Sequence, residues 1–254
     1  MPALVLVSTK GSPGVTTAAA ALAAVATRSR RSLLVELDPA GGAVQVLSSG
    51  PAAWGLVDTA GQLRRVVASA AVDDHTTLLP AGVPSLVAPT AGTIAESTIV
   101  SAGDRWLPGL RAAVPDVVVD AGRWEPTQRT ASRIVGADLV AVVCRPTVPG
   151  VESTRLGLER LVPMRRAVRP DEVAAHLDVP LGGMLAWDPR GAGNLWAAGV
   201  TRRWLRTRLA RSAATTLAGL NDLAARAAAQ TYAQAQIVGP PPAPPPAPGA
   251  EAWA

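Results

Sequence analysis

Short apolar runs alternate with helical stretches along most of this chain, and no other feature limits the choice of fold as strongly. Such alternation is typical of a parallel α/β sheet, in which each helix returns the chain to the same edge. Several runs carry valine and leucine at both even and odd positions, as expected for strands covered on both faces. We therefore expect an α/β fold of three layers, with a mostly parallel central sheet and helices on both faces.

The alternation places the expected elements along the chain. Strands are predicted at Ala3–Ser8, Ser32–Glu36, Ser85–Ala88, Val117–Asp120, Leu139–Cys144 and Leu181–Ala186. Helices are predicted at Thr16–Arg28, Gly61–Ala70, Ile94–Val114, Thr127–Val135, Val151–Arg166, Asp171–Leu177 and Pro189–Ala198. A final helical region runs from about Thr201 to Tyr232, and Gly219 leaves open whether it is one helix or two.

Length and composition favour one globular domain followed by a tail. The chain has 254 residues, of which 48% are hydrophobic and 17% charged, enough apolar material for a sizeable core. We expect this domain to span residues 1–238. Seven prolines between Gly239 and Gly249 exclude a helix or a central strand, so residues 239–254 are predicted to be a disordered, extended tail. The tail is either inert or a docking site for a proline-reading partner.

Cysteine usage and apolar segments narrow the cellular setting. The single cysteine, Cys144, excludes an intrachain disulfide and provides no cysteine cluster for zinc. It lies in an expected strand, where we interpret it as a small core residue. The first apolar run ends at Ser8 and no signal peptide or transmembrane segment is visible, so we expect a cytoplasmic protein.

The only lysine of the chain, Lys10, lies in the run Lys-Gly-Ser-Pro-Gly-Val-Thr-Thr that ends at Thr17. This run follows the first expected strand and opens an alanine-rich helix. A glycine-containing turn between a strand and a helix is where backbone N–H groups and a helix N-terminus can hold phosphate. We interpret the run as a phosphate-binding loop, the alternative being that a sole lysine stands here by chance.

Three segments are expected to meet at the C-terminal edge of the sheet, where open α/β folds bind their ligands. They are the Lys10–Thr17 loop, residues 35–42 (Val-Glu-Leu-Asp-Pro-Ala-Gly-Gly) and residues 117–122 (Val-Val-Val-Asp-Ala-Gly). In this order and spacing they resemble the MinD/ParA family of P-loop ATPases, whose deviant Walker A loop has the form Lys-Gly-Gly-x-Gly-Lys-Thr-Thr. The likeness extends through Trp187-Asp188-Pro189-Arg190 and covers roughly residues 1 to 220.

The resemblance implies ATP and Mg²⁺ as cofactors and assigns roles position by position. Lys10 matches the lysine that reaches across a dimer interface to the partner's phosphates, and Thr16 matches the hydroxyl that ligates Mg²⁺. Asp38 matches the carboxylate that orients the attacking water, and Asp120 matches the Walker B acid that supports the metal through water. Glu36 stands where the family commonly has another aspartate. Phosphoryl transfer needs these elements: cations around the phosphates, a held metal and a positioned water.

Each of the polar candidates also has a purely structural interpretation. Asp38 precedes a proline and suits a turn, Asp120 suits a cap on the following loop, and Thr16 suits a helix N-cap. The neighbouring phosphate loop favours the functional interpretation for these residues. By the same resemblance, the cofactor-binding residues of the loop are Gly11, Ser12, Pro13, Gly14, Val15, Thr16 and Thr17.

The loop departs from the family pattern at three positions. Val15 occupies the place of the second lysine, which neutralises phosphate charge, and a charge pair at 4 Å is worth about 4 kcal/mol at an effective dielectric of 20. Pro13 has no N–H to give to a phosphate, and Ser12 replaces a glycine. Either arginines such as Arg123 and Arg145 substitute for the lost lysine, or the nucleotide binds weakly or not at all.

A second departure lies between Leu161 and Pro180. The family usually places a strand there, and residues near that strand commonly help to hold the adenine base. This chain has two prolines and three arginines within residues 162–170, which argue against a central strand. We therefore expect the strand to be missing or reduced, which leaves recognition of the base in question.

The excess positive charge comes from one short segment. The net charge is +5, and five arginines with no acid lie between Thr201 and Arg211, around Trp204, Leu205 and Leu209. This pattern suits a helix packed on the sheet with a solvated outer face, nonspecific DNA contact, or a membrane-surface helix. DNA ranks above membrane because a proline tail follows. The arginines are Arg202, Arg203, Arg206, Arg208 and Arg211.

The leading hypothesis is a MinD/ParA-like nucleotide switch with a degenerate P-loop and slow or absent ATP hydrolysis. It positions or partitions DNA or a cellular assembly. ATP promotes a homodimer in which Lys10 crosses the interface, and the dimer binds a surface or a protein partner. The competing hypothesis is a non-catalytic scaffold of the same fold that serves a secretion, pilus or conjugation assembly. A nitrogenase-reductase-type redox protein is disfavoured, because one cysteine cannot supply the paired ligands of a bridging cluster.

Overall fold

The computed structural model describes residues 3–10, 14–48, 55–63, 72, 74–80, 82–124, 129–158, 179–197 and 202–238. Within these residues a six-stranded sheet has the order β3-β4-β2-β5-β1-β6. All neighbouring strands are parallel except β3 and β4, which confirms the expected α/β class. The strands are β1 (Ala3–Ser8), β2 (Ser32–Glu36), β3 (Thr77–Leu78), β4 (Pro84–Leu86), β5 (Asp116–Arg123) and β6 (Leu139–Val142).

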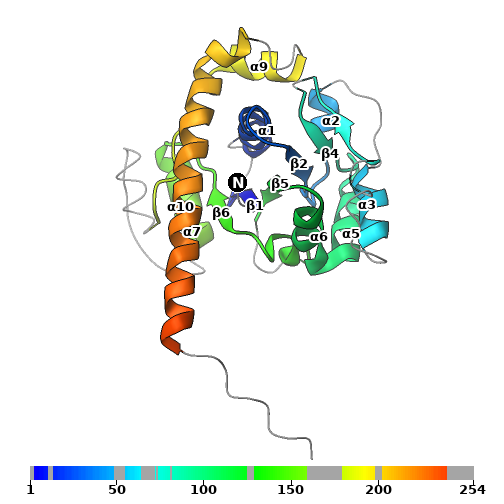
Figure 1. Cartoon of the computed structure of the whole chain (residues 1–254). Coiled ribbons are helices and arrows are strands. Elements are labelled where there is room, and N and C mark those ends of the chain that lie inside the picture. Colours follow the sequence, from blue (N-terminus) through cyan, green and yellow to red (C-terminus); the bar gives the residue numbers. More distant parts are fainter. Residues whose placement is uncertain are drawn as a thin grey trace, which may run out of the picture.

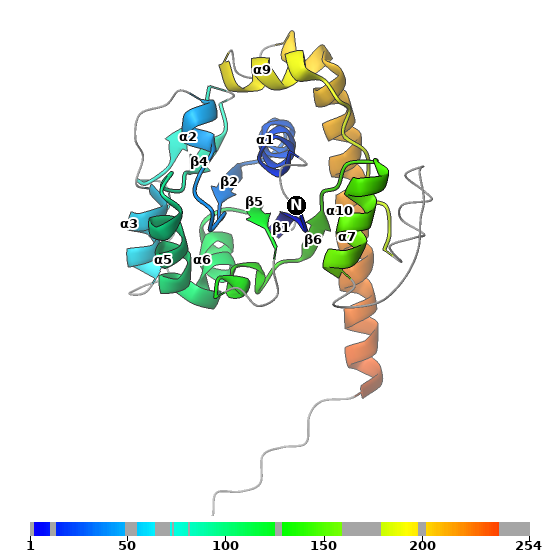
Figure 2. The ribbon, with the colours of Figure 1, turned by 180° about the vertical axis from the view of Figure 1, so that it is seen from behind.

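Helices cover both faces of this sheet, as Figures 1 and 2 show from opposite sides. The α-helices are α1 (Val15–Ala26), α2 (Val44–Leu47), α3 (Gly55–Leu63), α5 (Gly92–Ala102), α6 (Trp106–Ala113), α7 (Val148–Leu158), α9 (Pro189–Ala197) and α10 (Arg208–Val238). Three short 3-10 helices are η1 (Gly103–Arg105), η2 (Ala131–Ile134) and η3 (Trp204–Arg206).

The residues of β1 show why the sheet is covered on both faces. All six are buried, and successive side chains point to opposite sides. Leu4 and Leu6 join a core cluster with α1, α9 and α10, whereas Val5 and Val7 join a second cluster with α3, α5 and α6. A continuous apolar run with no polar alternation is what a strand between two helical layers requires.

Alanines let α1 lie close to the sheet and to α10. Nine of its 12 residues are buried, and most of them are alanine. The helix begins after Gly14, whose φ of +98° lies in the left-handed region that favours glycine. It ends at Thr27, whose hydroxyl and amide both donate to the carbonyl of Ala23. The left-handed Gly14 thus leads directly into a buried helix.

The last helix, α10, is a long element that packs over only part of its length. Its inward side chains from Leu209 to Ala224 are buried with α1, whereas residues 225–230 are exposed. Figure 1 shows its C-terminal half extending past the sheet. Within the described part of the chain, no helix combines the length and the apolarity that crossing a bilayer requires.

Several expected elements differ from those observed. The helix predicted at Ile94–Val114 is divided into α5 and α6 by η1, where Gly103 adopts a φ of +58°. The helix predicted at Thr127–Val135 is reduced, in its described residues, to the 3-10 turn η2. The last helical region is interrupted at Thr207, whose ψ of 159° is extended, and it continues through Gly219 without a break.

The strand predicted at Leu181–Ala186 is wrong, because these residues pair with no strand of the described sheet. They lie instead along α10. The Ala186 N–H donates to the Ser212 hydroxyl at 2.9 Å, and the Thr216 hydroxyl donates to the Met184 carbonyl at 3.2 Å. Gly182 and Gly183 pack so closely against α10 that a side chain at either would collide with it. The segment therefore uses a helix rather than a strand as its partner.

Some predictions lie outside the described residues. They are the helix at Asp171–Leu177, the missing or reduced strand between Leu161 and Pro180, and the proline-rich tail at 239–254. Parts of the helices predicted at Gly61–Ala70 and Val151–Arg166 also lie there.

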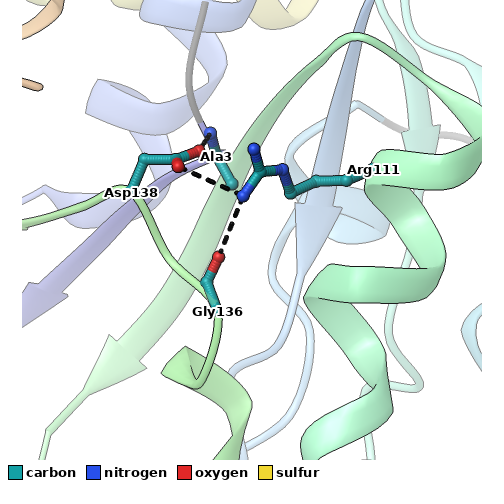
Figure 3. A network of polar contacts seen from close by, with 4 residues as sticks. All are labelled: Ala3, Arg111, Gly136 and Asp138. Carbon is teal, nitrogen blue, oxygen red and sulfur yellow. Dashed lines mark hydrogen bonds and ion pairs between the residues drawn. The ribbon is translucent and has the colours of Figure 1, made fainter. Parts of the chain in front are cut away.

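A polar cluster fastens the amino ends of β1 and β6 (Figure 3). The Asp138 carboxylate accepts the Ala3 N–H at 2.7 Å and a contact from the Arg111 guanidinium at 3.1 Å. Arg111, which comes from α6, also donates to the Gly136 carbonyl at 3.5 Å. This cluster lies at the sheet edge opposite to the one where the candidate site is formed.

Candidate functional site

Strand register places two acidic residues side by side at the carboxyl edge of the sheet. Glu36 and Asp120 are partners on the adjacent strands β2 and β5, and Leu6 of β1 is level with Asp120. Asp38 follows β2 by two residues, and Gly14 and Thr16 follow β1. The three segments that the sequence singles out therefore lie at one edge.

Asp120 carries a carboxylate oxygen that the described residues leave unpaired. The residue is only 1% exposed, and its Oδ1 accepts the Gly122 N–H at 3.0 Å. Among the described residues, Oδ2 has no hydrogen-bond partner although it is buried. Burial raises the pKa of Asp120 to about 6, and the charge of Asp38 adds to this rise. The Thr16 hydroxyl lies near enough to lower the pKa, but it does not complete a hydrogen bond to Oδ2.

Asp38 is held by a local turn and by the backbone at the end of β5. Its Oδ1 accepts the Ala40 N–H at 2.9 Å, as the predicted turn requires. Gly122, with a φ of +61°, lies so close to the Asp38 carboxyl that any side chain at position 122 would collide with it. Burial raises the pKa of Asp38, while the Ala40 N–H and the positive charge of Arg133 oppose the rise.

Glu36 connects two loops rather than standing free in the site. Its Oε1 accepts the N–H groups of Ala43 at 2.6 Å and Val44 at 3.0 Å, and its Oε2 accepts the Ala88 N–H at 3.0 Å. Burial raises its pKa to about 7, against these three hydrogen bonds. The residue therefore fixes the loop after β2 to the end of β4, and it does so from beside Asp120.

Arg133 is the cation of this cluster, and the sequence analysis missed it. It is fully buried and interacts electrostatically with Asp38. Of the arginines expected to approach the site, Arg123 is the last residue of β5 and has an exposed side chain, and Arg145 stacks over Trp187 with its guanidinium 5.9 Å from the ring centre. Arg133 has no local sequence signal, because it stands alone in a segment that predicts only a helix.

The phosphate loop is described in part. Lys10 is exposed at the end of β1, Gly14 takes the left-handed conformation, and Thr16 is half-buried on the first turn of α1. Val15 is only 6% exposed and belongs to the core cluster with α1, so it faces the protein interior. Thr17 is half-buried, whereas Gly11, Ser12 and Pro13 lie outside the described residues.

The residues present fit a nucleotide with its magnesium ion. A buried carboxylate oxygen of Asp120, without a partner in the described part of the chain, lies near the Thr16 hydroxyl at the N-terminus of a helix, where anions are favoured. The described residues contain no cluster of three or more side chains that would hold a metal by themselves. Mg²⁺ is usually held by one or two protein groups together with waters and substrate phosphates, so such a cluster is not required.

The mostly parallel sheet with helices on both faces has the three-layer fold of the P-loop NTPases. More particularly, it is the fold of the MinD and ParA ATPases. The chain is similar to the cell division ATPase MinD of Pyrococcus furiosus, with 19% identity over 88% of this chain and 100% of that chain, and a TM-score of 0.64.

Two further solved structures show the same likeness. The ParA family ATPase of Chlorobium tepidum has 13% identity over 85% of this chain and 98% of that chain, with a TM-score of 0.68. The MinD of Pyrococcus horikoshii, complexed with Mg-ADP, has 18% identity over 89% and 98%, with a TM-score of 0.63. No protein-family model and no curated protein sequence matches the chain.

Asp188 of the Trp-Asp-Pro-Arg segment caps two helices. Its Oδ1 accepts the Gly191 N–H at 2.9 Å at the start of α9, and its Oδ2 accepts the Leu209 N–H at 3.2 Å at the start of α10. These hydrogen bonds lower its pKa. The segment therefore has a structural role, which is to hold two helix N-termini together.

The basic segment presents its charges outward. All five arginines that the sequence singles out are exposed, whereas Trp204 is fully buried and its indole N–H donates to the Gly191 carbonyl at 3.0 Å. Leu209 is also buried. The apolar side chains thus anchor the segment to the core and leave an arginine surface facing solvent.

Proposed function

We propose that the protein is a nucleotide-dependent switch that binds ATP with Mg²⁺ in the cytoplasm and has slow or absent ATP hydrolysis. The observation that carries this proposal is the buried Oδ2 of Asp120, which lies beside the Thr16 hydroxyl and has no hydrogen-bond partner among the described residues. A buried polar atom without a partner costs about 1–3 kcal/mol, so its retention favours a ligand that completes it.

The chain's own groups divide the work at this site. When bound, Mg²⁺ supplies positive charge that stabilises the phosphates during transfer. Thr16 would provide a hydroxyl ligand for the metal, and Asp120 would accept hydrogen bonds from a metal-bound water. Asp38, fixed by its turn and by Gly122, orients a water molecule. Lys10, exposed at the end of β1, reaches the phosphates of the partner in a homodimer.

Slow hydrolysis follows from the distribution of charge around the loop. Val15 faces the core, so the first turn of α1 offers no side-chain cation to the phosphates. This loss reduces turnover more than it reduces binding of the nucleotide, because main-chain groups and the helix N-terminus still attract phosphate.

The biological role that we propose is the positioning or partitioning of DNA or of a cellular assembly. The similar structures include a cell division ATPase and a MinC:MinD complex from Aquifex aeolicus, which is 15% identical with a TM-score of 0.57. A protein partner would therefore read the nucleotide state of this chain. The exposed arginine surface near the start of α10 would contact DNA phosphates without sequence preference.

Calorimetry and sedimentation with ATP and Mg²⁺ test the switch. We expect binding in the micromolar to millimolar range, an increase in mass to that of a dimer, and little phosphate release. Lys10→Ala should abolish the increase in mass, while Lys10→Arg, which keeps the charge, should retain part of it. Absence of both heat and dimer at millimolar nucleotide would contradict the proposal and favour the non-catalytic scaffold of the same fold.

DNA binding needs a separate test with a charge-matched control. Arg202→Ala with Arg206→Ala removes two charges from the arginine surface, and Arg28→Ala with Arg31→Ala removes two exposed charges between α1 and β2. We expect the first pair to weaken binding to a duplex by about tenfold and to flatten its salt dependence by about two units. Equal effects of the two pairs would show that net charge alone attracts the DNA.

A further inference from the structure

Arg133 occupies an unusual place for an arginine in this fold. Its side chain is fully buried, although it comes from the short turn η2 and must desolvate a full positive charge. Burial lowers its pKa to about 10, and the negative charge of Asp38 opposes this. The Trp124 ring covers the guanidinium, with 5.2 Å between the ring centre and Cζ. An arginine kept here despite its desolvation needs a specific set of partners.

The guanidinium bonds to carbonyls on both sides of Gly122. Its Nε and Nη2 donate to the Ala121 carbonyl at 3.3 and 3.2 Å, and Nη2 also donates to the Arg123 carbonyl at 2.8 Å. Its Nη1 donates to the carbonyl and hydroxyl of Thr130 at 2.8 and 2.7 Å. These contacts hold the end of β5 in a fixed conformation against the following turn.

Gly122 transmits this fixed conformation to both candidate aspartates. Its N–H donates to Asp120 Oδ1, and its Cα lies against the Asp38 carboxyl. The backbone segment that Arg133 clamps is therefore the one that orients both carboxyl groups. A planar guanidinium, whose five donors have a fixed geometry, suits this task better than an ammonium group, whose three donors leave from a single nitrogen.

We propose that Arg133 is a positioning residue that clamps the backbone around Gly122 and so fixes the Asp38 and Asp120 carboxyl groups for Mg²⁺-nucleotide. It touches neither metal nor phosphate. Its charge also offsets part of the negative charge that the two aspartates place at this edge. The clamp concerns the protein without ligand, whereas its effect on the nucleotide rests on the proposed function.

Amide hydrogen exchange measured by NMR tests the clamp without any ligand. Arg133→Lys keeps the positive charge but loses the planar arrangement of guanidinium donors, and Arg133→Met keeps only an apolar chain of similar length. We expect exchange at the Gly122 and Ala40 amides to accelerate at least tenfold in Arg133→Lys, beyond any change at amides of the sheet core. Arg111→Met is the matched control, because it removes an arginine that also bonds a backbone carbonyl but at the opposite edge (Figure 3).

A uniform acceleration across the sheet in Arg133→Lys, with no excess at Gly122 and Ala40, would overturn the proposal and leave Arg133 a general stabiliser. Should Arg133→Met fail to fold, Arg133→Lys decides the question alone. A second readout uses a fluorescent ATP analogue with Mg²⁺ or with EDTA. In the presence of Mg²⁺, we expect Arg133→Lys to bind the analogue about tenfold more weakly than the native protein does. In EDTA, we expect the two affinities to be equal. If the native protein binds no analogue, the proposed function fails while the exchange result still judges the clamp.

Discussion

Two aspartates on β5 are equally buried but differ in the partners of their carboxylate groups. Asp116 at the amino end of the strand and Asp120 near its carboxyl end are each 1% exposed. Asp116 forms an ion pair with Arg30, with 3.7 Å between Oδ2 and Nε. Among the described residues, Asp120 leaves Oδ2 without a hydrogen-bond partner, and its pKa is raised to about 6. The ion pair of Asp116 stabilises the fold, whereas the burial of the Asp120 carboxylate destabilises it.

The same contrast extends to the two edges of the sheet. At the amino edge Asp138 pairs with Arg111 at 3.1 Å, in the cluster drawn in Figure 3. At the carboxyl edge the cation, Arg133, is bonded mainly to backbone carbonyls, and the carboxyl groups have raised pKa values. A fold that needed only stability would pair the carboxylates at both edges. The difference favours the functional site that we propose at the carboxyl edge.

The largest change in stability that we expect comes from adding a side chain at Gly122, beside the Asp38 carboxyl. Gly122→Ala places a methyl group on the Asp38 carboxyl and forces alanine into a left-handed conformation. We expect it to lower the free energy of unfolding by about 3 kcal/mol, measured by urea denaturation. Gly82→Ala is the control, because Gly82 has a φ of +71° but open space around it, and it should cost about 1 kcal/mol. Similar costs for both variants would show that only backbone strain matters at position 122.

Exchanging each β5 aspartate for asparagine tests the comparison itself. Asp120→Asn removes a desolvated charge and turns an NH₂ group toward the Thr16 hydroxyl, so we expect the unliganded protein to gain about 1–2 kcal/mol at pH 8. Mg²⁺-dependent nucleotide binding should weaken about 10–100-fold. Asp116→Asn should instead lose about 1 kcal/mol and leave binding unchanged. The comparison fails if both variants are destabilised alike, as thermal unfolding and calorimetry would reveal.

Stability should fall as the pH rises, because two buried acids have raised pKa values. Unfolded Asp and Glu titrate near 3.8 and 4.5, whereas folded Asp120 and Glu36 titrate near 6 and 7. The folded state therefore binds more protons, and the contribution of these groups is fully present below pH 4 and lost through pH 7. We expect the free energy of unfolding, measured by urea denaturation, to decrease by about 2 kcal/mol from pH 6 to pH 8, and by less in Asp120→Asn. A flat profile in the native protein would contradict the assignment.

The smallest effect concerns a carboxylate whose two oxygens both have partners. Asp188→Ala removes the cap shared by α9 and α10 and should cost about 1 kcal/mol, which differential scanning calorimetry can measure. Asp188→Asn keeps one acceptor oxygen and should recover part of that loss. Nucleotide binding should be unaffected in both variants, and a change in affinity would instead give this segment a part in the site.

The sequence predicts the central strands well and the polar clamp not at all. The bounds of β1 and β2 agree with the expected runs, because each run is apolar on both faces and ends at a turn. Leu181–Ala186 has a similar apolar composition but lies on α10, and composition does not distinguish a strand neighbour from a helix surface. Arg133 escapes prediction for another reason: its acceptors at positions 121 and 123 are backbone carbonyls, which leave no trace in the side-chain pattern.

The alanine surface of α1 has a consequence for how this protein can evolve. An alanine methyl group has no alternative rotamers. The distances from α1 to the sheet and to α10 are therefore set almost entirely by the backbones of these elements. A larger residue on this surface would push the helix that carries Thr16 away from Asp120. Substitutions at the buried alanines of α1 are therefore restricted, whereas the exposed residues 225–230 of α10 can vary widely without disturbing the acidic edge.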